Sequence, residues 1–366
     1  MGAAGIIFSE GKFGQIDELV RKRTEASIPF GGRYRLIDFA LSNMVNAGVV
    51  QVAVVTKRNY QSLMDHIGSG KDWDLSRKNG GVVIFPPFGN YKSGTVYANQ
   101  IEALQGIIGF ISKCQEENLI ITECNSVNVV DYSEALAFHE KHNADITVIG
   151  KKQKAEFNNP HLVATLEKNG QIKSACMAHK VDGFTGIDAY IIKRQLLENL
   201  LGEASIHGYA SIEQEMIINN IASLKIFGYE YKGTLLAIDS MQHYYEYNMA
   251  LLDEAVRRSL LEILPIYTKT RDSAPTRFGL EAHVENSLIA DGCMIEGTVI
   301  NSIIFRGVKI AKGTVVENCI LMQDTVVMNN VKLKAVITDK NVTIRDRQEL
   351  VGCAQLPYFV GKGMMI

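Results

Sequence analysis

The sequence predicts an α/β domain with a mostly parallel sheet, followed by a parallel β-helix. Two observations carry this prediction. Short apolar runs alternate with amphipathic segments up to about residue 255, and aliphatic residues recur at six-residue steps in the last third of the chain. Strand–helix–strand alternation favours parallel strands joined by right-handed crossovers. The six-residue step is typical of hexapeptide coils, which have three flat faces and stack on one another.

The first domain is expected to contain buried strands and amphipathic helices in alternation. The apolar runs expected to form strands lie at residues 5–8, 49–55, 119–122 and 146–149. The second run is β-branched without a period, which suits a strand that is buried on both faces. Helices are expected at 36–45, where apolar residues fall at helical spacing before Gly48, and at 133–142. Ligands of parallel sheets bind beyond the carboxyl ends of strands, so chemistry is expected after Thr122.

The last third contains a repeat that begins at Val284, Val299 and Val316 and returns more faintly at Leu333. One coil cannot bury its own apolar face, so such repeats must stack. A β-sandwich is the alternative, but its strands would be separated by hairpin turns rather than six-residue steps. The segment at 263–276 contains two prolines and clustered polar residues, which are typical of an extended linker. We therefore predict an α/β domain at 1–264, a linker at 265–280 and a left-handed hexapeptide β-helix at 281–366.

Composition narrows the classes of partner. A formal net charge of −2 over 366 residues gives no reason to expect nucleic acid or an anionic membrane as a partner. No apolar run approaches the roughly 20 residues that a membrane span needs. The six cysteines are scattered without zinc-like spacing, which indicates reduced thiols. A cytoplasmic protein is the expectation.

One stretch is long and specific: Pro29-Phe30-Gly31-Gly32-Arg33-Tyr34-Arg35, followed by Asp38-Phe39-Ala40-Leu41-Ser42-Asn43. With Gly94-Thr95, Val130-Asp131-Tyr132, Tyr267-Thr268-Lys269-Thr270-Arg271 and Gly361-Lys362-Gly363, it resembles the ADP-glucose pyrophosphorylases (glucose-1-phosphate adenylyltransferases). The resemblance covers nearly the whole chain. It implies a Rossmann-like, GT-A-like nucleotidyltransferase domain, a left-handed β-helix and a role in ADP-glucose synthesis for glycogen.

The chemistry of that family sets what the site needs. The phosphate of glucose 1-phosphate attacks the α-phosphorus of ATP and pyrophosphate leaves. Backbone N–H groups, cations and carboxylate-bound Mg²⁺ must therefore stabilise charge on phosphate oxygens. The resemblance implies a glycine-rich loop after the first strand, a lysine ahead of Pro-Phe-Gly-Gly, a Gly-Asp metal site after the strand at 119–122, a Glu-Lys-Pro clamp and a second metal-binding aspartate.

The chain departs from each of these features. The loop after the first strand keeps Gly11 and Gly14 but has no arginine, and Glu25 stands at the lysine position. Asn125 stands at the metal aspartate, and an amide cannot neutralise Mg²⁺. No Glu-Lys-Pro occurs, and the second acid falls near Thr234. The nucleotide-binding remnants are Gly11, Gly14, Gly94 and Thr95, and no metal ligand is expected.

Several losses in one site predict negligible turnover, because one transition-state electrostatic group is worth on the order of 10²–10³ in rate. The chain as a whole resembles a non-catalytic glycogen-biosynthesis subunit of some Gram-positive bacteria. This implies a hetero-oligomer with a catalytic adenylyltransferase subunit, which would hold the Mg²⁺, while this chain binds no cofactor. Sheet edges leave self-association open.

Three alternatives stay open. Glu123 lies two residues before Asn125 on an extended segment, so it faces the same way and could hold the metal of an active nucleotidyltransferase. An acyltransferase is another class, because hexapeptide β-helices often carry that activity. Such an enzyme needs a catalytic base between coils, and only His283 lies near the repeats. Lys22 and Arg23 correspond to a basic stretch that faces an effector anion in active relatives; a solvated cluster with Arg21 is the alternative.

Overall fold

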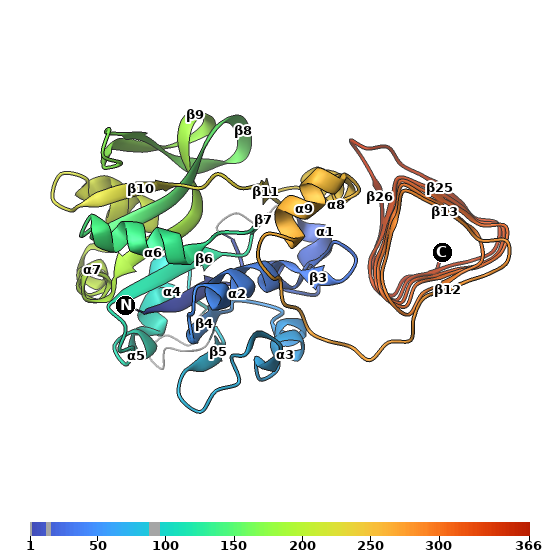
Figure 1. The fold of residues 1–366 in the computed structure, drawn as a ribbon, viewed down its shortest axis with the longest axis horizontal. Helices are drawn as coiled ribbons and strands as arrows, with labels where there is room; N and C mark the ends of the chain where they lie inside the picture. The colour runs from blue at the N-terminus through green and yellow to red at the C-terminus, as the bar shows by residue number, and fades with distance from the viewer. Residues whose placement is uncertain (1, 12–15, 88–95) are drawn as a thin grey trace.

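The computed structural model describes residues 2–11, 16–87 and 96–366. An α/β domain and a triangular β-helix lie next to each other along the longest axis of the molecule (Figure 1). The central sheet of the α/β domain has, among the described residues, the strand order β10-β8-β9-β6-β1-β4-β5. Its strands are β1 (Ala3–Phe8), β4 (Gln51–Val55), β5 (Gly81–Phe85), β6 (Asn118–Glu123), β8 (Ile146–Leu166), β9 (Ile172–Lys193) and β10 (Ile226–Glu230).

The sheet is mostly parallel, as predicted, and β9 alone among these strands runs antiparallel to both of its neighbours. The four predicted strands are present. The sequence pattern did not show that β8 and β9 extend far past the sheet as a long twisted pair with several register shifts. Polar residues alternate along that extension, which is typical of strands with one solvated face.

Helices cover both faces of the sheet. Their bounds are α1 (Asp17–Val20), α2 (Leu36–Asn46), α3 (Gln61–Ile67), α4 (Gln100–Gly106), α5 (Ile108–Ile111), α6 (Tyr132–Lys141), α7 (Arg194–His207), α8 (Met241–Ala250) and α9 (Glu254–Leu261). Successive strand residues point to opposite faces, so Ile6 packs with α4, α5 and α7, whereas Ile7 packs with α2, α3 and α6. Both faces of β1 are therefore buried.

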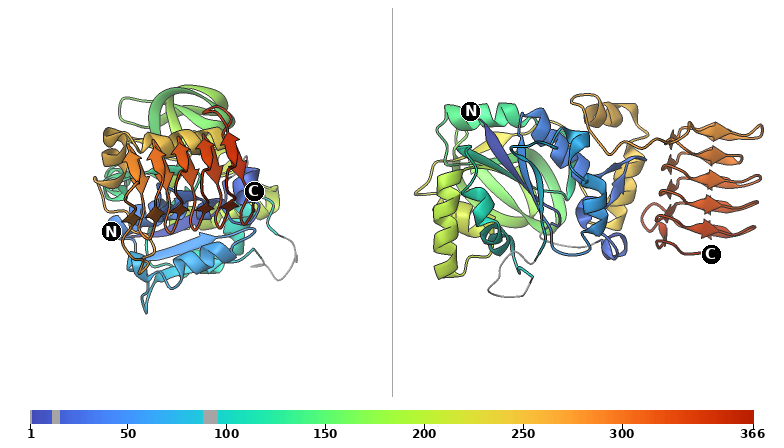
Figure 2. Two further views of the ribbon diagram at one scale, coloured as in Figure 1. Left: turned by 90° about the vertical axis from the view of Figure 1, so that its right-hand side faces the viewer. Right: turned by 90° about the horizontal axis from the view of Figure 1, so that it is seen from below.

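The C-terminal domain consists of three parallel five-stranded sheets, one for each face of the triangle (Figures 1 and 2). The strands are β12 (Arg277–Phe278), β13 (His283–Glu285), β14 (Leu288–Ile289), β15 (Met294–Ile295), β16 (Thr298–Ile300), β17 (Ile303–Ile304), β18 (Lys309–Ile310), β19 (Val315–Glu317), β20 (Ile320–Leu321), β21 (Val326–Val327), β22 (Lys332–Lys334), β23 (Val336–Thr338), β24 (Thr343–Ile344), β25 (Glu349–Val351) and β26 (Tyr358–Val360).

The predicted repeats stack in register. Val284, Val299, Val316 and Leu333 occupy equivalent positions, and Leu350 continues the column in a fifth coil that the sequence pattern did not show. The repeated asparagine has a conformational reason, because Asn286, Asn301 and Asn318 all have a positive φ between 41° and 52°. Asparagine tolerates this left-handed conformation better than most residues.

The two domains share an apolar interface. Phe30 and Tyr244 of the first domain pack in one buried cluster with Ile303, Ile320 and Ile337 of the β-helix. The linker lies on the α/β domain, and β12 of the β-helix begins at Arg277, inside the segment that the sequence analysis gave to the linker (265–280). The backbone N–H of Tyr267 donates to Ser42 Oγ at 2.9 Å, and Thr270 Oγ1 donates to Asp72 Oδ1 at 2.9 Å. Among the described residues, no helix is long and apolar enough to cross a membrane.

Candidate functional site

A cleft of about 770 Å³ opens beyond the carboxyl ends of β1 and β4, where a parallel sheet binds its ligands. Glu10 and Gly11, which follow β1, line one wall, and Lys57 and Arg58, which follow β4, line another. The sequence analysis expected chemistry after Thr122, and Glu123 adjoins the cleft through Gln100, a lining residue whose Nε2 donates to Glu123 Oε1. Gly14, Gly94 and Thr95, which were predicted to remain from a nucleotide site, lie outside the described residues.

A carboxylate occupies the loop that follows β1. The backbone N–H of Gly11 donates to Glu25 Oε2 at 2.7 Å. A Cβ added to Gly11 would lie 3.1 Å from that oxygen and 3.2 Å from Glu123 Oε2, so both acids approach the loop closely. Burial raises the pKa of Glu25 to about 8, and the nearby charges of Glu123, Glu10 and Asp188 act in the same direction. The loop therefore lies among acids, and Glu25 keeps its proton at neutral pH.

The residues at the expected metal position do not fit a magnesium ion. Asn125 Nδ2 donates to Glu123 Oε2 and to Asp188 Oδ2, each at 3.2 Å, and Gln100 Nε2 donates to Glu123 Oε1 at 2.5 Å. A cation beside Glu123 would face these N–H groups, whereas Mg²⁺ needs oxygen ligands. In the part of the chain that the structure describes, no group of three or more acids, histidines or cysteines is arranged to hold a metal.

Thr234, near which the second metal-binding aspartate was expected, is polar but uncharged, as Asn125 is. Thr234 Oγ1 is 2.7 Å from Ser259 Oγ of α9. The alternative base of an acyltransferase, His283, is exposed on β13 beside Glu285. Neither residue lines the cleft in the part of the chain that the structure describes.

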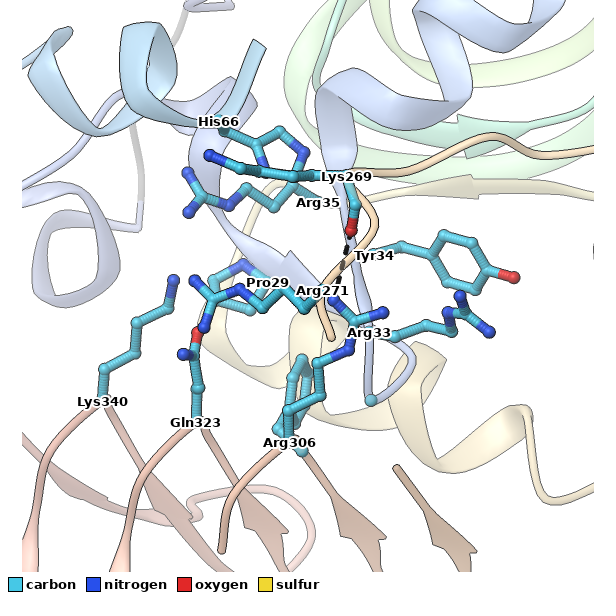
Figure 3. A pocket seen from close by; sticks show the side chains of 12 residues that line it. Pro29, Arg33, Tyr34, Arg35, His66, Lys269, Arg271, Arg306, Gln323 and Lys340 are labelled. Atoms are coloured by element: carbon cyan, nitrogen blue, oxygen red, sulfur yellow. Dashed lines mark hydrogen bonds between the residues drawn. The ribbon is translucent and has the colours of Figure 1, made fainter. Parts of the chain in front are cut away.

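A second site lies between the domains, and the sequence did not predict it. Figure 3 shows a pocket whose walls come from four parts of the chain. The β2–β3 hairpin (Pro29–Phe30 and Tyr34–Arg35), His66 of α3, the linker and three successive turns of the β-helix meet there. The lining residues are Pro29, Gly32, Arg33, Tyr34, Arg35, His66, Lys269, Arg271, Phe305, Arg306, Gln323 and Lys340.

The pocket is strongly cationic. Six of its lining side chains are arginine or lysine, and none is an acid. Arg306 Nε lies 3.0 Å from Oδ1 of Asp291, which is not one of the lining residues. The pKa of Arg35 is lowered to about 10, mainly by burial, and the charges of Arg23 and Arg271 act in the same direction. Planar guanidinium groups bind phosphate and carboxylate with two parallel hydrogen bonds, so this arrangement suits a polyanion.

The Pro29–Arg35 motif forms the wall of this pocket. Gly31 has a φ of +58° and donates its N–H to Asn248 Oδ1 of α8 at 2.9 Å, and Tyr244 Oη donates to the carbonyl of Pro29 at 2.7 Å. Asp38 accepts the backbone N–H of Arg35 at 2.9 Å and lies 2.6 Å from His66 Nε2. The motif thus fixes Arg35 against both α8 and α3.

Arg23 joins the cleft to the β-helix. It lines the cleft, is only 3% exposed, and its NH2 lies 2.5 Å from Asp339 Oδ1. Its NH1 is buried and has no hydrogen-bond partner among the described residues. The alternative of a solvated basic cluster is therefore wrong for Arg23, while Arg21 and Lys22 are exposed.

Comparison with known proteins agrees with this architecture. Residues 4–175 match the family model described as Nucleotidyl transferase, and residues 274–355 match the one described as GlmU-like, C-terminal hexapeptide. The second match confirms the predicted left-handed hexapeptide β-helix.

Three relatives align over most of their length. The chain is 33% identical over 360 residues to the glycogen biosynthesis protein GlgD of Bacillus subtilis (strain 168). That alignment covers 96% of this chain and 93% of the relative. It is 36% identical over 313 residues to GlgD of Geobacillus stearothermophilus, with 85% and 82% covered. It is 31% identical over 326 residues to the glucose-1-phosphate adenylyltransferase of Mycoplasma mobile, with 86% and 84% covered.

A nucleotidyl transferase domain joined to a hexapeptide β-helix is the architecture of a sugar-phosphate nucleotidyltransferase. The identity and coverage show more than the architecture. The chain belongs to the glucose-1-phosphate adenylyltransferase family, and within it the chain is similar to the GlgD glycogen biosynthesis proteins over nearly its full length.

Proposed function

We propose that this chain is a non-catalytic, regulatory subunit in glycogen biosynthesis, which assembles in the cytoplasm with a catalytic glucose-1-phosphate adenylyltransferase subunit. The observation that carries the proposal is the bond from the Gly11 N–H to Glu25. An acid side chain there occupies a donor that the reaction needs for phosphate, and it stands where the resemblance implies a lysine, so the cation that would attract the triphosphate is missing. The amides of Asn125 and Gln100 bond to the Glu123 oxygens that a Mg²⁺ would need, which supports a metal held by the catalytic partner instead.

The interdomain pocket supports the regulatory part of the proposal. Six arginine and lysine side chains line it, and Arg35, Arg271 and Lys340 come from the first domain, the linker and the β-helix. An anion bound there would favour the arrangement of the domains that brings these charges together, and a ligand with unequal affinity for two conformations shifts their populations. Arg23 extends this network to the cleft, while Lys22 lies exposed beside it.

The open end of the β-helix supports the assembly with a partner. Phe278 and Val284 stand in register with buried core residues of the next coil, yet they are 58% and 36% exposed. Leu280, in the same first coil, is fully exposed. Apolar side chains that continue a core in this way are typical of a protein interface. A second copy of this chain is the competing occupant.

Turnover assays test the proposal. The purified chain is assayed for ADP-glucose formation from ATP, Mg²⁺ and glucose 1-phosphate, first alone and then mixed with a catalytic homologue. We expect no turnover alone, and a change in the partner's rate or effector response in the mixture. Robust turnover by the chain alone overturns the proposal. The variant Glu123→Gln then decides whether Glu123 holds the metal, because loss of that turnover would support the displaced-carboxylate alternative.

A further inference from the structure

Lys340 differs from the other cations of the interdomain pocket in its surroundings. It follows β23 on a turn of the β-helix, lies half-buried and lines the pocket. Arg35 from the start of α2, Arg23 from the segment after α1, and Arg271 from the linker are the charged groups that oppose its positive charge. His66 of α3 also senses the Lys340 charge. Arginines therefore face Lys340 from the first domain and from the linker.

Among the described residues, Asp339 is the acid whose charge favours the protonated form of Lys340, and it is already engaged. Asp339 lies 2.5 Å from Arg23 NH2, and its Oδ1 also accepts the backbone N–H of Lys340 at 2.7 Å. No hydrogen bond from Lys340 Nζ is found within the described residues. Burial lowers the pKa of Lys340 to about 6, and the guanidinium groups of Arg35, Arg23 and Arg271 contribute to that shift. At neutral pH the amine of the empty pocket is mostly neutral.

We propose that Lys340 takes up one proton when the interdomain pocket binds a dianionic oxyanion such as a phosphate monoester or sulfate. The inference rests on the proposed role of the pocket as an effector site, and it adds that effector binding is coupled to protons. The balance is simple: the lone pair of Nζ accepts a proton from the buffer, and no other bond forms or breaks. The resulting ammonium group then faces the bound anion.

The coupling has a defined sign. A bound dianion favours the charged form of Lys340, so binding raises the proton affinity of the amine, and by reciprocity protonation raises the affinity for the anion. Anion affinity should therefore increase as pH falls, by at most about tenfold per pH unit. The arginines of the pocket cannot produce this dependence, because they stay charged throughout. His66 is the competing acceptor of the proton, and the experiment must exclude it.

Titration calorimetry with sulfate tests the inference on the full-length chain. Sulfate stays doubly charged across the neutral range, so the ligand contributes no protons of its own. Binding is measured at pH 7.5 in HEPES and in Tris, which differ widely in ionisation enthalpy, and the difference in apparent enthalpy gives the protons exchanged. We expect an uptake close to one proton per sulfate, and tighter binding at pH 6.5 than at pH 7.5.

Substitutions assign the proton. Lys340→Arg keeps a positive charge that does not titrate, so it should bind sulfate without proton uptake and with little pH dependence. Lys340→Met should lose the uptake and bind more weakly. Arg271→Met should also bind more weakly but keep the uptake, and Lys332→Met, on the exposed face of β22, should match the unaltered chain.

The outcomes separate this inference from the proposed function. Sulfate binding without proton uptake, or an uptake that persists in Lys340→Met, overturns the role of Lys340 and leaves the pocket as an anion site. Absence of sulfate binding at both pH values overturns the inference together with the effector role of the pocket. The turnover assay decides the non-catalytic role independently of either result.

Discussion

Glu25 accepts the backbone N–H of Gly11 at 2.7 Å, across the mouth of the cleft that follows β1. The two residues come from different segments. Glu25 begins a short 3-10 turn (Glu25–Ser27), two residues after Arg23 in the sequence. The bond places a side-chain oxygen where the resemblance to nucleotidyltransferases implies a phosphate oxygen. The substitution at position 25 therefore changes both the charge of the cleft and the occupancy of its backbone donor.

Replacing Glu25 by glutamine should stabilise the protein at alkaline pH. Because the folded state raises the pKa of this acid to about 8 from 4.5, the folded chain keeps a proton between those values that the unfolded chain releases. Stability from this group is fully present below pH 4.5 and is lost as pH rises through 8, at about 1.4 kcal/mol per pH unit within that window. The glutamine still accepts the Gly11 N–H and carries no such dependence.

Urea denaturation at pH 5 and pH 8 measures this effect. Glu25→Gln should show a free energy of unfolding close to that of the unaltered chain at pH 5, and a clearly larger one at pH 8. Glu281→Gln, at an exposed position in the β-helix, serves as the matched control and should follow the unaltered chain at both pH values. Equal stability of Glu25→Gln and the unaltered chain at pH 8 would contradict the burial of a titrating acid.

Restoring an acid at position 125 should create a dependence on magnesium. Asn125→Asp removes an amide that donates to both Glu123 and Asp188 and places a third carboxylate beside them. Without metal, repulsion and the lost bonds should lower stability by about 1–3 kcal/mol. Millimolar Mg²⁺ should then raise the melting temperature of this variant but leave the unaltered chain unchanged.

Asn125→Ala is the control for that experiment, since it removes the same donor without adding a ligand. Its melting temperature should be lower than that of the unaltered chain, both with and without Mg²⁺. A variant with aspartate that shows no response to Mg²⁺ would mean that Glu123 and Asp188 cannot reorient as oxygen ligands. In that case the loss of metal binding extends beyond the residue at position 125.

Breaking the ion pair between Arg23 and Asp339 should weaken the contact of the two domains. Both side chains are buried, and removing one partner of a buried pair typically costs about 3–5 kcal/mol because the other charge stays without compensation. Arg23→Met and Asp339→Asn should each lower the free energy of unfolding by about that amount.

A double-mutant cycle measures the coupling energy of the two residues. The exposed pair of Glu254 and Arg258 on α9, which is worth at most about 1 kcal/mol, provides the comparison. Additive effects of the two substitutions would show that the pair does not couple the domains.

The open coil of the β-helix gives a prediction about assembly. Leu280→Arg and Phe278→Ser change exposed side chains, so the melting temperature of the isolated chain should stay within a few degrees. Light scattering after size-exclusion chromatography of the mixture with a catalytic homologue should show loss of the hetero-oligomer. Leu356→Arg, which is also exposed but lies on the loop between β25 and β26, should leave the complex intact. Complexes that survive both first-coil substitutions would place the interface elsewhere.

Much of the fold follows from local patterns. The strand at Val52, Ala53 and Val54 and the coils that begin at Val284, Val299 and Val316 could be predicted because their apolar residues recur at spacings that only a few structures can bury. The cleft could also be anticipated, since the loops after parallel strands gather at one edge of the sheet. The long extension of β8 and β9 could not, because its alternation of polar residues carries no information on how far two strands remain paired.

The sequence by itself determined the family, the order of the domains and the loss of charge-handling residues at positions 25 and 125, because these depend on residue identity and local spacing. Only the tertiary structure decided where the displaced charges act. It put the Glu25 carboxylate on the Gly11 N–H, and it turned Arg23 away from solvent onto Asp339. It also gathered Arg35, Arg271 and Lys340 into one pocket. Their mutual repulsion depends on distances between atoms that are far apart in the chain, and packing of the two domains is what sets those distances.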